Sequence, residues 1–235
     1  MDKAIYKRVI IKLSGEALAG AAGSGIDEKV LSGVVDQIIE VKNLGVEIGI
    51  IVGGGNFWRG RQGAEMDRTT ADHMGMLATV INALAIQDAL ERKGIPTRVQ
   101  TALTITRVAE PYILRKALSH LTKGRVVIFA CGTGNPYFTT DTAAALRAAE
   151  TDAEILLLAK NVDGIYDSDP RINPNAKKLE SISYKEFIAQ GLKAMDTTAI
   201  TICMENNIPV LAFGLNEDRA LYRAVTGGKI GTLIK

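Results

Sequence analysis

Residues 133–141 contain the densest group of side chains that could bind a ligand, in the order Thr-Gly-Asn-Pro-Tyr-Phe-Thr-Thr-Asp. The segment follows an apolar run at 126–130 and precedes a predicted helix over 142–150. A helix N-terminus offers unpaired backbone N–H groups and the positive end of the helix dipole, which favour an anion. The hydroxyls, amide and aromatic rings beside it suit a flat, polar molecule. The segment predicts a site for a nucleotide or a phosphorylated small molecule, while helix capping by Thr139 or Thr140 is the simpler alternative.

A lysine closes the first predicted strand. Lys12 follows the apolar residues 9–11 and is itself followed by Ser14 and Gly15. At the end of a strand its ammonium group could meet a phosphate, while the backbone N–H groups of the next residues approach the same oxygens. An ordinary surface lysine before a turn is the alternative interpretation.

Three glycines follow the second predicted strand, at positions 53–55, and Arg59 and Arg61 come shortly after them. Glycine lets backbone amides come close to a ligand that a side chain would block. Arginine offers a planar pair of N–H donors that match phosphate oxygens. This segment therefore predicts a second phosphate-binding turn rather than a merely flexible one.

Apolar runs and turn residues predict alternating strands and helices. Strands are expected at 9–11, 46–52, 98–101, 126–130, 155–158 and 208–213, the last being the final core strand. Helices are expected after an Asp27 cap, over 70–93, from Pro111 to about 123, over 142–150, and near Tyr184 and Asp196. Continuous apolar strands separated by helices predict an α/β fold, with a mainly parallel sheet covered on both faces. Ligands in such sheets bind beyond the carboxyl ends of the strands.

Composition narrows the class of protein. The 235 residues carry a net charge of +2, which gives no broad electrostatic footprint for nucleic acid. No apolar run approaches the roughly 18 residues that a membrane span needs, and residues 1–3 lead into a strand pattern rather than a signal peptide. Cys131 and Cys203 both lie in apolar contexts, which favours two buried free thiols in a reducing compartment. We expect one cytoplasmic domain over 1–235, with no nucleic-acid or membrane partner.

Familiar catalytic motifs are absent from the sequence. The glycine and lysine residues at 227–229 lack the spacing of a phosphate-binding P-loop, and the glycines at 20–25 have the dinucleotide spacing reversed. His73 and His120 are the only histidines, and no histidine or cysteine cluster has zinc spacing. We therefore assign no metal-ligating residue.

Taken together, four segments resemble the amino acid kinase superfamily and, within it, the uridylate kinases of bacteria. They are Lys-Leu-Ser-Gly-Glu at 12–16, Gly-Gly-Gly-Asn at 53–56 with Arg59, the segment 132–141, and Asn-Val-Asp-Gly-Ile-Tyr at 161–166 with Asp169. The resemblance covers residues 6 to 235. The first two segments are shared across the superfamily, whereas the third points to UMP as the phosphate acceptor. The implied fold is a three-layer αβα sandwich whose N-terminal part binds mainly UMP and whose residues from about 150 to 235 bind mainly ATP.

The resemblance implies a phosphoryl transfer from ATP to UMP that gives ADP and UDP, with Mg²⁺ accompanying ATP. It assigns catalysis to Lys12, Arg59, Asp141 and Asp196, with Asp196 orienting Lys12 and Asp141 ordering the acceptor loop. It assigns ATP binding to Lys12, Leu13, Ser14, Gly15, Gly55, Arg59, Lys160, Asn161, Tyr166 and Asp169, either Lys160 or Asn161 facing the adenine. It assigns UMP binding to Gly54, Asp72, Thr133, Gly134, Asn135, Pro136, Tyr137, Phe138, Thr139 and Thr140. Asp72 has an alternative explanation as a carboxylate in the first turn of a helix, where the positive end of the helix dipole stabilises it.

Regulation and assembly are also implied by the resemblance alone. Activation by GTP would involve Gly20, Ala21, Ala22, Gly23, Ser24 and Gly25. Without the resemblance, these residues predict a flexible surface loop. Feedback inhibition by UTP, a role in UTP and CTP biosynthesis and a homohexamer belong to the same expectation. Two other functions stay open: a kinase of the superfamily that acts on an amino acid or carbamate, and a uridine-nucleotide sensor without catalysis.

Overall fold

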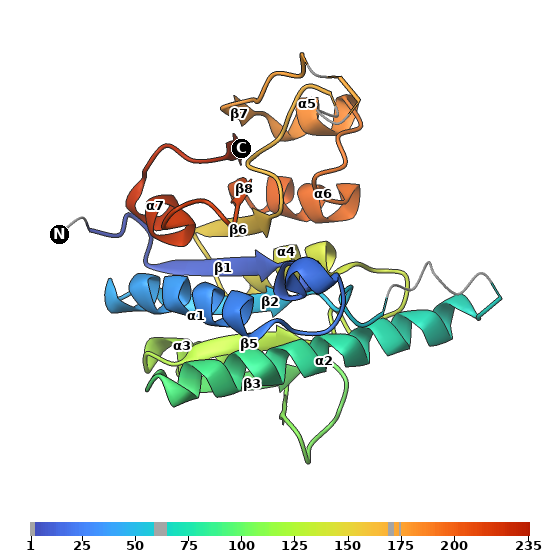
Figure 1. Cartoon of the computed structure of the whole chain (residues 1–235), viewed down its shortest axis with the longest axis vertical. Helices are drawn as coiled ribbons and strands as arrows, with labels where there is room; N and C mark the ends of the chain where they lie inside the picture. The colour runs from blue at the N-terminus through green and yellow to red at the C-terminus, as the bar shows by residue number, and fades with distance from the viewer. Residues whose placement is uncertain (1–2, 59–64, 169–171, 174) are drawn as a thin grey trace.

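A nine-stranded sheet forms the centre of the described structure (Figure 1). The computed structural model describes residues 3–58, 65–168, 172–173 and 175–235. The strand order is β4-β3-β5-β2-β1-β6-β8-β9-β7, and all neighbouring pairs are parallel except the antiparallel pair β8–β9. The strands are β1 (Arg8–Leu13), β2 (Glu47–Val52), β3 (Thr97–Thr101), β4 (Glu110–Pro111), β5 (Val126–Ala130), β6 (Ile155–Lys160), β7 (Ser181–Ile182), β8 (Val210–Gly214) and β9 (Thr232–Ile234).

Helices cover both faces of this sheet. One face packs against α1 (Glu28–Asn43), α2 (Arg68–Arg92) and α7 (Ala220–Thr226). The other face packs against α3 (Leu114–Thr122), α4 (Thr140–Glu150), α5 (Tyr184–Ala189) and α6 (Thr197–Glu205). Two short 3₁₀ helices, η1 (Gly15–Leu18) and η2 (Gly20–Ala22), connect β1 to α1. The predicted α/β sandwich with a mainly parallel sheet is confirmed.

Side chains alternate along β1 between the two layers. Val9, Ile11 and Leu13 belong to the core under α1 and α7, while Ile10 belongs to the core under α4 and α6. All four are fully buried, which explains why the central strands are continuous apolar runs. Lys12, by the same alternation, lies on the α4 face.

The first two long helices begin at aspartate caps. The Asp27 side chain accepts hydrogen bonds from the backbone N–H groups of Lys29 and Val30, as predicted. Asp67 accepts the Thr70 N–H and starts α2 two residues earlier than predicted. Asp72 therefore lies beyond the first turn of α2, which weakens its interpretation as a carboxylate placed for the helix dipole.

The structure corrects two predicted elements. Pro111 does not begin a helix, because it belongs to the edge strand β4 and α3 starts only at Leu114. An edge strand tolerates a proline that cannot donate a hydrogen bond. The strand β8 is also not the last one, since α7 and β9 follow it and β9 inserts between β8 and β7. The strands β7 and β9 have two and three residues, too few to give a periodic pattern.

Cys131 and Cys203 are buried and unpaired, which confirms the prediction of two free thiols. None of the helices in the described part of the chain combines the length and the apolar character that a membrane span requires.

Candidate active site

The predicted phosphate-binding segments converge because their strands are neighbours. The four central strands lie in the order β5-β2-β1-β6, all parallel, so their carboxyl ends meet at one edge of the sheet. Gly132 follows β5, the glycines at 53–55 follow β2, Ser14 follows β1, and Lys160 ends β6. The edge therefore gathers segments that are far apart in the sequence.

The glycine turn after β2 packs too closely for side chains. A Cβ atom at Gly54 would lie 2.8 Å from the Ala78 Cβ atom and from the Gly75 carbonyl oxygen, both on α2. A Cβ atom at Gly15 would lie 2.6 Å from the Gly53 carbonyl oxygen. Contacts this short occur essentially only where no Cβ atom exists, so packing alone requires glycine at Gly15 and Gly54.

Three charged side chains meet on the α4 face of the sheet. The Lys12 Nζ atom lies 2.6 Å from Asp141 Oδ1, and the two side chains are 11% and 15% exposed. Lys12 pairs across the sheet with Leu158, so Lys160, two residues further along β6, lies on the same face. Burial lowers the pKa of Lys160, the Asp141 carboxylate opposes this shift, and the Lys12 ammonium adds to it. Two cations share one carboxylate, which leaves positive charge available for a polyphosphate.

Asp196 holds the start of α4 rather than Lys12. It is the N-cap of α6, and its carboxylate accepts the Ala199 N–H at 2.7 Å. The Thr142 hydroxyl donates to it at 3.1 Å, and the Thr139 hydroxyl donates to it as well. Among the described side chains, the carboxylate that pairs with Lys12 is Asp141. The contacts of the two aspartates are thus the reverse of those expected, because α4 brings Asp141 over β1 while α6 starts beside Thr139.

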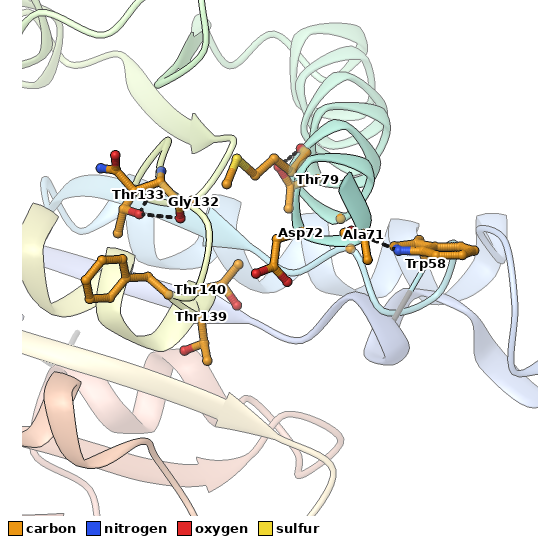
Figure 2. A pocket seen from close by; sticks show the side chains of 13 residues that line it. Trp58, Ala71, Asp72, Thr79, Gly132, Thr133, Thr139 and Thr140 are labelled. Carbon is orange, nitrogen blue, oxygen red and sulfur yellow. Dashed lines mark hydrogen bonds between the residues drawn. The ribbon is translucent and has the colours of Figure 1, made fainter. Parts of the chain in front are cut away.

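A pocket lies between α2 and the segment that follows β5. Its open volume, including the part exposed to solvent, is about 540 Å³. Figure 2 shows Asp72 and Thr79 on α2 across the pocket from Thr133, Thr139 and Thr140. The lining residues are Gly54, Trp58, Ala71, Asp72, Gly75, Met76, Thr79, Gly132, Thr133, Asn135, Phe138, Thr139 and Thr140. Thr139 is also the N-cap of α4, so the capping alternative is confirmed for this residue, which lines the pocket as well.

The segment after β5 has a strained backbone that its contacts maintain. Cys131 and Tyr137 have positive φ angles of 65° and 72°, which residues with a side chain rarely adopt. The Tyr137 N–H donates to Asp72 Oδ2 at 2.8 Å, and the Arg68 Nε atom lies 3.1 Å from the same oxygen. The Arg68 guanidinium also lies over the Tyr137 ring, 5.2 Å from its centre. Asp72 therefore ties this segment to α2 at the mouth of the pocket.

A sequence model of the amino acid kinase family matches residues 7–213. The chain belongs to the amino acid kinase family. Among solved structures, UMP kinase from Bacillus anthracis is similar over 98% of this chain and 96% of that chain, with 39% identity and a TM-score of 0.95. UMP kinase from Ureaplasma parvum matches over the full length of both chains, with 40% identity and a TM-score of 0.92. Uridylate kinase from Archaeoglobus fulgidus is more distant, with 25% identity, a TM-score of 0.73 and 97% and 99% coverage.

Two residues that the family resemblance assigned to ATP, Asn161 and Tyr166, form no side-chain hydrogen bond with the charged group around Lys12 in the described part of the chain. Asn161 is exposed, and the Tyr166 hydroxyl donates to Asp163 Oδ1 at 2.8 Å. The side chain of Lys160 interacts with the charges of Lys12 and Asp141, so it belongs to the same charged group. Arg59, Arg61 and Asp169 fall outside the described residues.

Three residues that border the site were not predicted from the sequence: two lie on α2 and one lies before it. Thr79 lines the pocket, Asn82 is buried behind the glycine turn, and the Trp58 indole N–H donates to the Ala71 carbonyl at 2.9 Å. A signal for the first two was present, because Thr79 and Asn82 are polar residues on a helix face whose neighbours are apolar. Together with Asp72 they follow helical spacing, which would have placed them on one face.

Proposed function

We propose that the protein transfers the terminal phosphoryl group of ATP to UMP. The observation that carries the proposal is the position of Lys12, paired with Asp141 and next to Lys160, at the sheet edge that also carries the glycine turn and the pocket beside Asp72. The UMP kinases from Bacillus anthracis and Ureaplasma parvum, which match nearly the whole chain, support UMP as the acceptor. The pocket beside Asp72 offers hydroxyl and carboxylate groups for a ribose and a base.

Electrostatics explains why such a site would need its two lysines. The acceptor phosphate and the ATP phosphates repel each other, so catalysis requires alignment and the neutralisation of charge. Lys12 and Lys160 supply positive charge in a partly buried site, where the lower dielectric constant strengthens their attraction to phosphate groups. The attacking oxygen of UMP is already ionised near neutral pH, since the second pKa of a phosphate monoester is about 6. The reaction therefore requires no general base.

Mg²⁺ enters this proposal as part of the ATP substrate. In the described part of the chain, no group of three or more histidine, cysteine, aspartate or glutamate side chains is arranged to hold a metal ion. The nearest carboxylates, Asp141 and Asp196, already hold Lys12 and the threonines of α4. Mg²⁺ commonly binds through phosphate oxygens, water and few protein ligands, which suits this donor set. Bound there, it would neutralise phosphate charge.

Activation by GTP is proposed for the loop of residues 20–25. The Gly25 N–H donates to the Asn56 carbonyl at 3.0 Å, and Asn56 Nδ2 donates to the Gly25 carbonyl at 2.6 Å. A ligand that moved this loop would move the residue that directly follows the glycine turn. Feedback inhibition by UTP would follow from its competition for the uridine pocket.

A homohexamer is proposed for the assembled enzyme. Met74, Leu77 and Ile81 form an exposed apolar stripe along α2, and Leu77 and Ile81 are each 49% exposed. Such a stripe favours burial against a second copy of the chain. The enzyme would supply UDP for UTP and CTP synthesis in the cytoplasm, where ATP and UMP are available.

Product formation tests the proposed function. We would incubate the protein with ATP and Mg²⁺ and with UMP, CMP, dUMP, aspartate, glutamate or carbamate, with and without GTP and UTP. UDP from UMP is the expected result. Turnover of a carboxylate or carbamate alone would keep the family and overturn the acceptor, and UMP binding without turnover would indicate a sensor. Light scattering on the same samples gives the oligomeric state.

A further inference from the structure

The inner face of α2 contacts two of the loops that border the candidate site, the segment after β5 and the glycine turn after β2. Asp72, Gly75, Thr79 and Asn82 are spaced by three, four and three residues, so they lie on one face of the helix. Asp72 and Gly75 contact the segment after β5 and the glycine turn, respectively. Thr79 and Asn82 are the deeper members, 2% and 0% exposed.

Asn82 is attached to the glycine turn by a closed set of hydrogen bonds. Its Nδ2 atom donates to the Gly53 carbonyl at 2.7 Å and to Asn56 Oδ1 at 2.7 Å. Its Oδ1 atom accepts from Asn56 Nδ2 at 3.0 Å. Both amide hydrogens and the carbonyl oxygen of Asn82 are used, so this buried side chain fixes the start and the end of the turn at once.

Thr79 is attached in the same way to the segment after β5. Its hydroxyl donates to the Met76 carbonyl within α2 at 2.6 Å and accepts the Cys131 N–H at 2.8 Å. Cys131 has the positive φ angle described above, and such strained conformations persist only where the surroundings hold them. Thr79 therefore holds the residue at which the chain turns from β5 into the segment that follows it.

We propose that Thr79 and Asn82 are positioning residues for phosphoryl transfer, which fix the acceptor segment and the phosphate-binding turn to one rigid helix. This inference rests on the proposed function. Donor and acceptor phosphates must meet in line, and misplacement by about 1 Å can lower a rate by about a hundredfold. Because the two loops are anchored three residues apart on one helix, their anchor points keep a fixed distance from each other.

The chemistry of the two positions argues for this role over core packing. Met76, Ala83, Ile86 and Leu90, also buried on α2, are all apolar. A buried polar side chain is costly unless every partner is present, and a valine would fill the space of Thr79 equally well. The hydroxyl and the amide are explained by the backbone groups that they hold in the two loops.

The test compares Thr79→Val with Thr79→Ser and with Thr151→Val. Thr151 is a matched control because it is 0% exposed and its hydroxyl donates only to the Arg147 carbonyl, at 2.6 Å, at the opposite end of α4 from Asp141. We expect Thr79→Val to lower kcat by about ten- to a hundredfold. Thr79→Ser keeps the hydroxyl, so it should stay within about threefold of the wild type, as should Thr151→Val.

Amide hydrogen exchange of the unliganded protein gives a readout that does not depend on activity. Thr79→Val should speed exchange in peptides covering 131–140, and Asn82→Ala should speed exchange in peptides covering 53–58. Asn82→Ala should also raise the KM for ATP more than the KM for UMP. Equal behaviour of Thr79→Val and Thr151→Val in exchange and in kcat would overturn the inference. Faster exchange with an unchanged kcat would overturn it too, because the bonds would then be structural only. A wild type that makes no UDP refutes the proposed function instead, and the exchange data still decide whether α2 anchors the loops.

Discussion

The ion pair between Lys12 and Asp141 gives the sharpest quantitative prediction. At 2.6 Å and an effective dielectric constant near 20, the attraction between the two charges is about 6 kcal/mol, and desolvation offsets much of it. Breaking a buried pair from one side typically costs about 3–5 kcal/mol. The two side chains retain slight exposure, so we expect Asp141→Asn to destabilise the fold by about 2–3 kcal/mol.

A double-mutant cycle measures this coupling directly. Lys12→Met, Asp141→Asn and the double variant would be compared by chemical denaturation and by steady-state kinetics. For a chain of this length, each 1 kcal/mol corresponds to about 2–4 °C in Tm. The coupling free energy should be about 2 kcal/mol, because the double variant leaves neither charge unpaired. Lys12→Met should lower kcat by about 10²–10⁴-fold, the scale of one lost electrostatic contact to a transition state.

Two results would refute this reasoning. A coupling free energy near zero would mean that the pair contributes nothing to the fold despite its short distance. A kcat reduced less than about tenfold in Lys12→Met, equivalent to about 1.4 kcal/mol, would remove Lys12 from the catalytic group. Unaltered circular dichroism of each variant serves as the control for folding.

Three further predictions address other parts of the site and fold. Lys160→Met should lower kcat and raise Tm at pH 7. Burial lowers the folded-state pKa of Lys160 below its ordinary 10.5, so protonation of this side chain favours the unfolded chain. The difference in Tm between the variant and the wild type should therefore shrink as pH rises towards 10.5. Asp72→Asn should raise the KM for UMP about tenfold, the loss of one charge-assisted hydrogen bond, and an unchanged KM would exclude Asp72 from the acceptor site. Gly231→Ala should lower Tm more than the control Gly23→Ala does. Both glycines have a positive φ angle, but only a Cβ atom at Gly231 would clash, with the Ala212 carbonyl oxygen. Equal changes in Tm would contradict this steric argument.

The central layers of the fold were predictable because their signals are local. Apolar runs at β1, β2, β5, β6 and β8 and the aspartate cap at Asp27 each follow from neighbouring residues, and the order of strands and helices implies a parallel sheet. The strand β9 was not predictable in this way. It has three residues and is defined by its partners β8 and β7, which lie far from it in the sequence.

The site was predictable as a set of segments but not as a set of contacts. Glycines and charged residues at strand ends indicated which loops gather at the sheet edge. The partner of Lys12 depends on how α4 and α6 pack, and no spacing in the sequence distinguishes Asp141 from Asp196. Thr79 and Asn82 act through backbone groups of other loops, so their role became visible only with those loops in place.

The insertion of β9 between β8 and β7 has a consequence for biosynthesis. The Leu233 and Lys235 N–H groups donate to the carbonyls of Glu180 and Ile182, and the Thr232 hydroxyl donates to the Leu179 carbonyl, so residues 232–235 hold the segment around β7 in place. Chains emerge from the ribosome N-terminus first, and the earlier part can fold while the later part is still inside. The half of the sheet that contains β1, β2, β3 and β5 can therefore assemble early, whereas β7 gains its neighbour only after residues 232–235 have left the exit tunnel. A nascent chain would complete the pocket beside Asp72 before the β7 edge of the sheet.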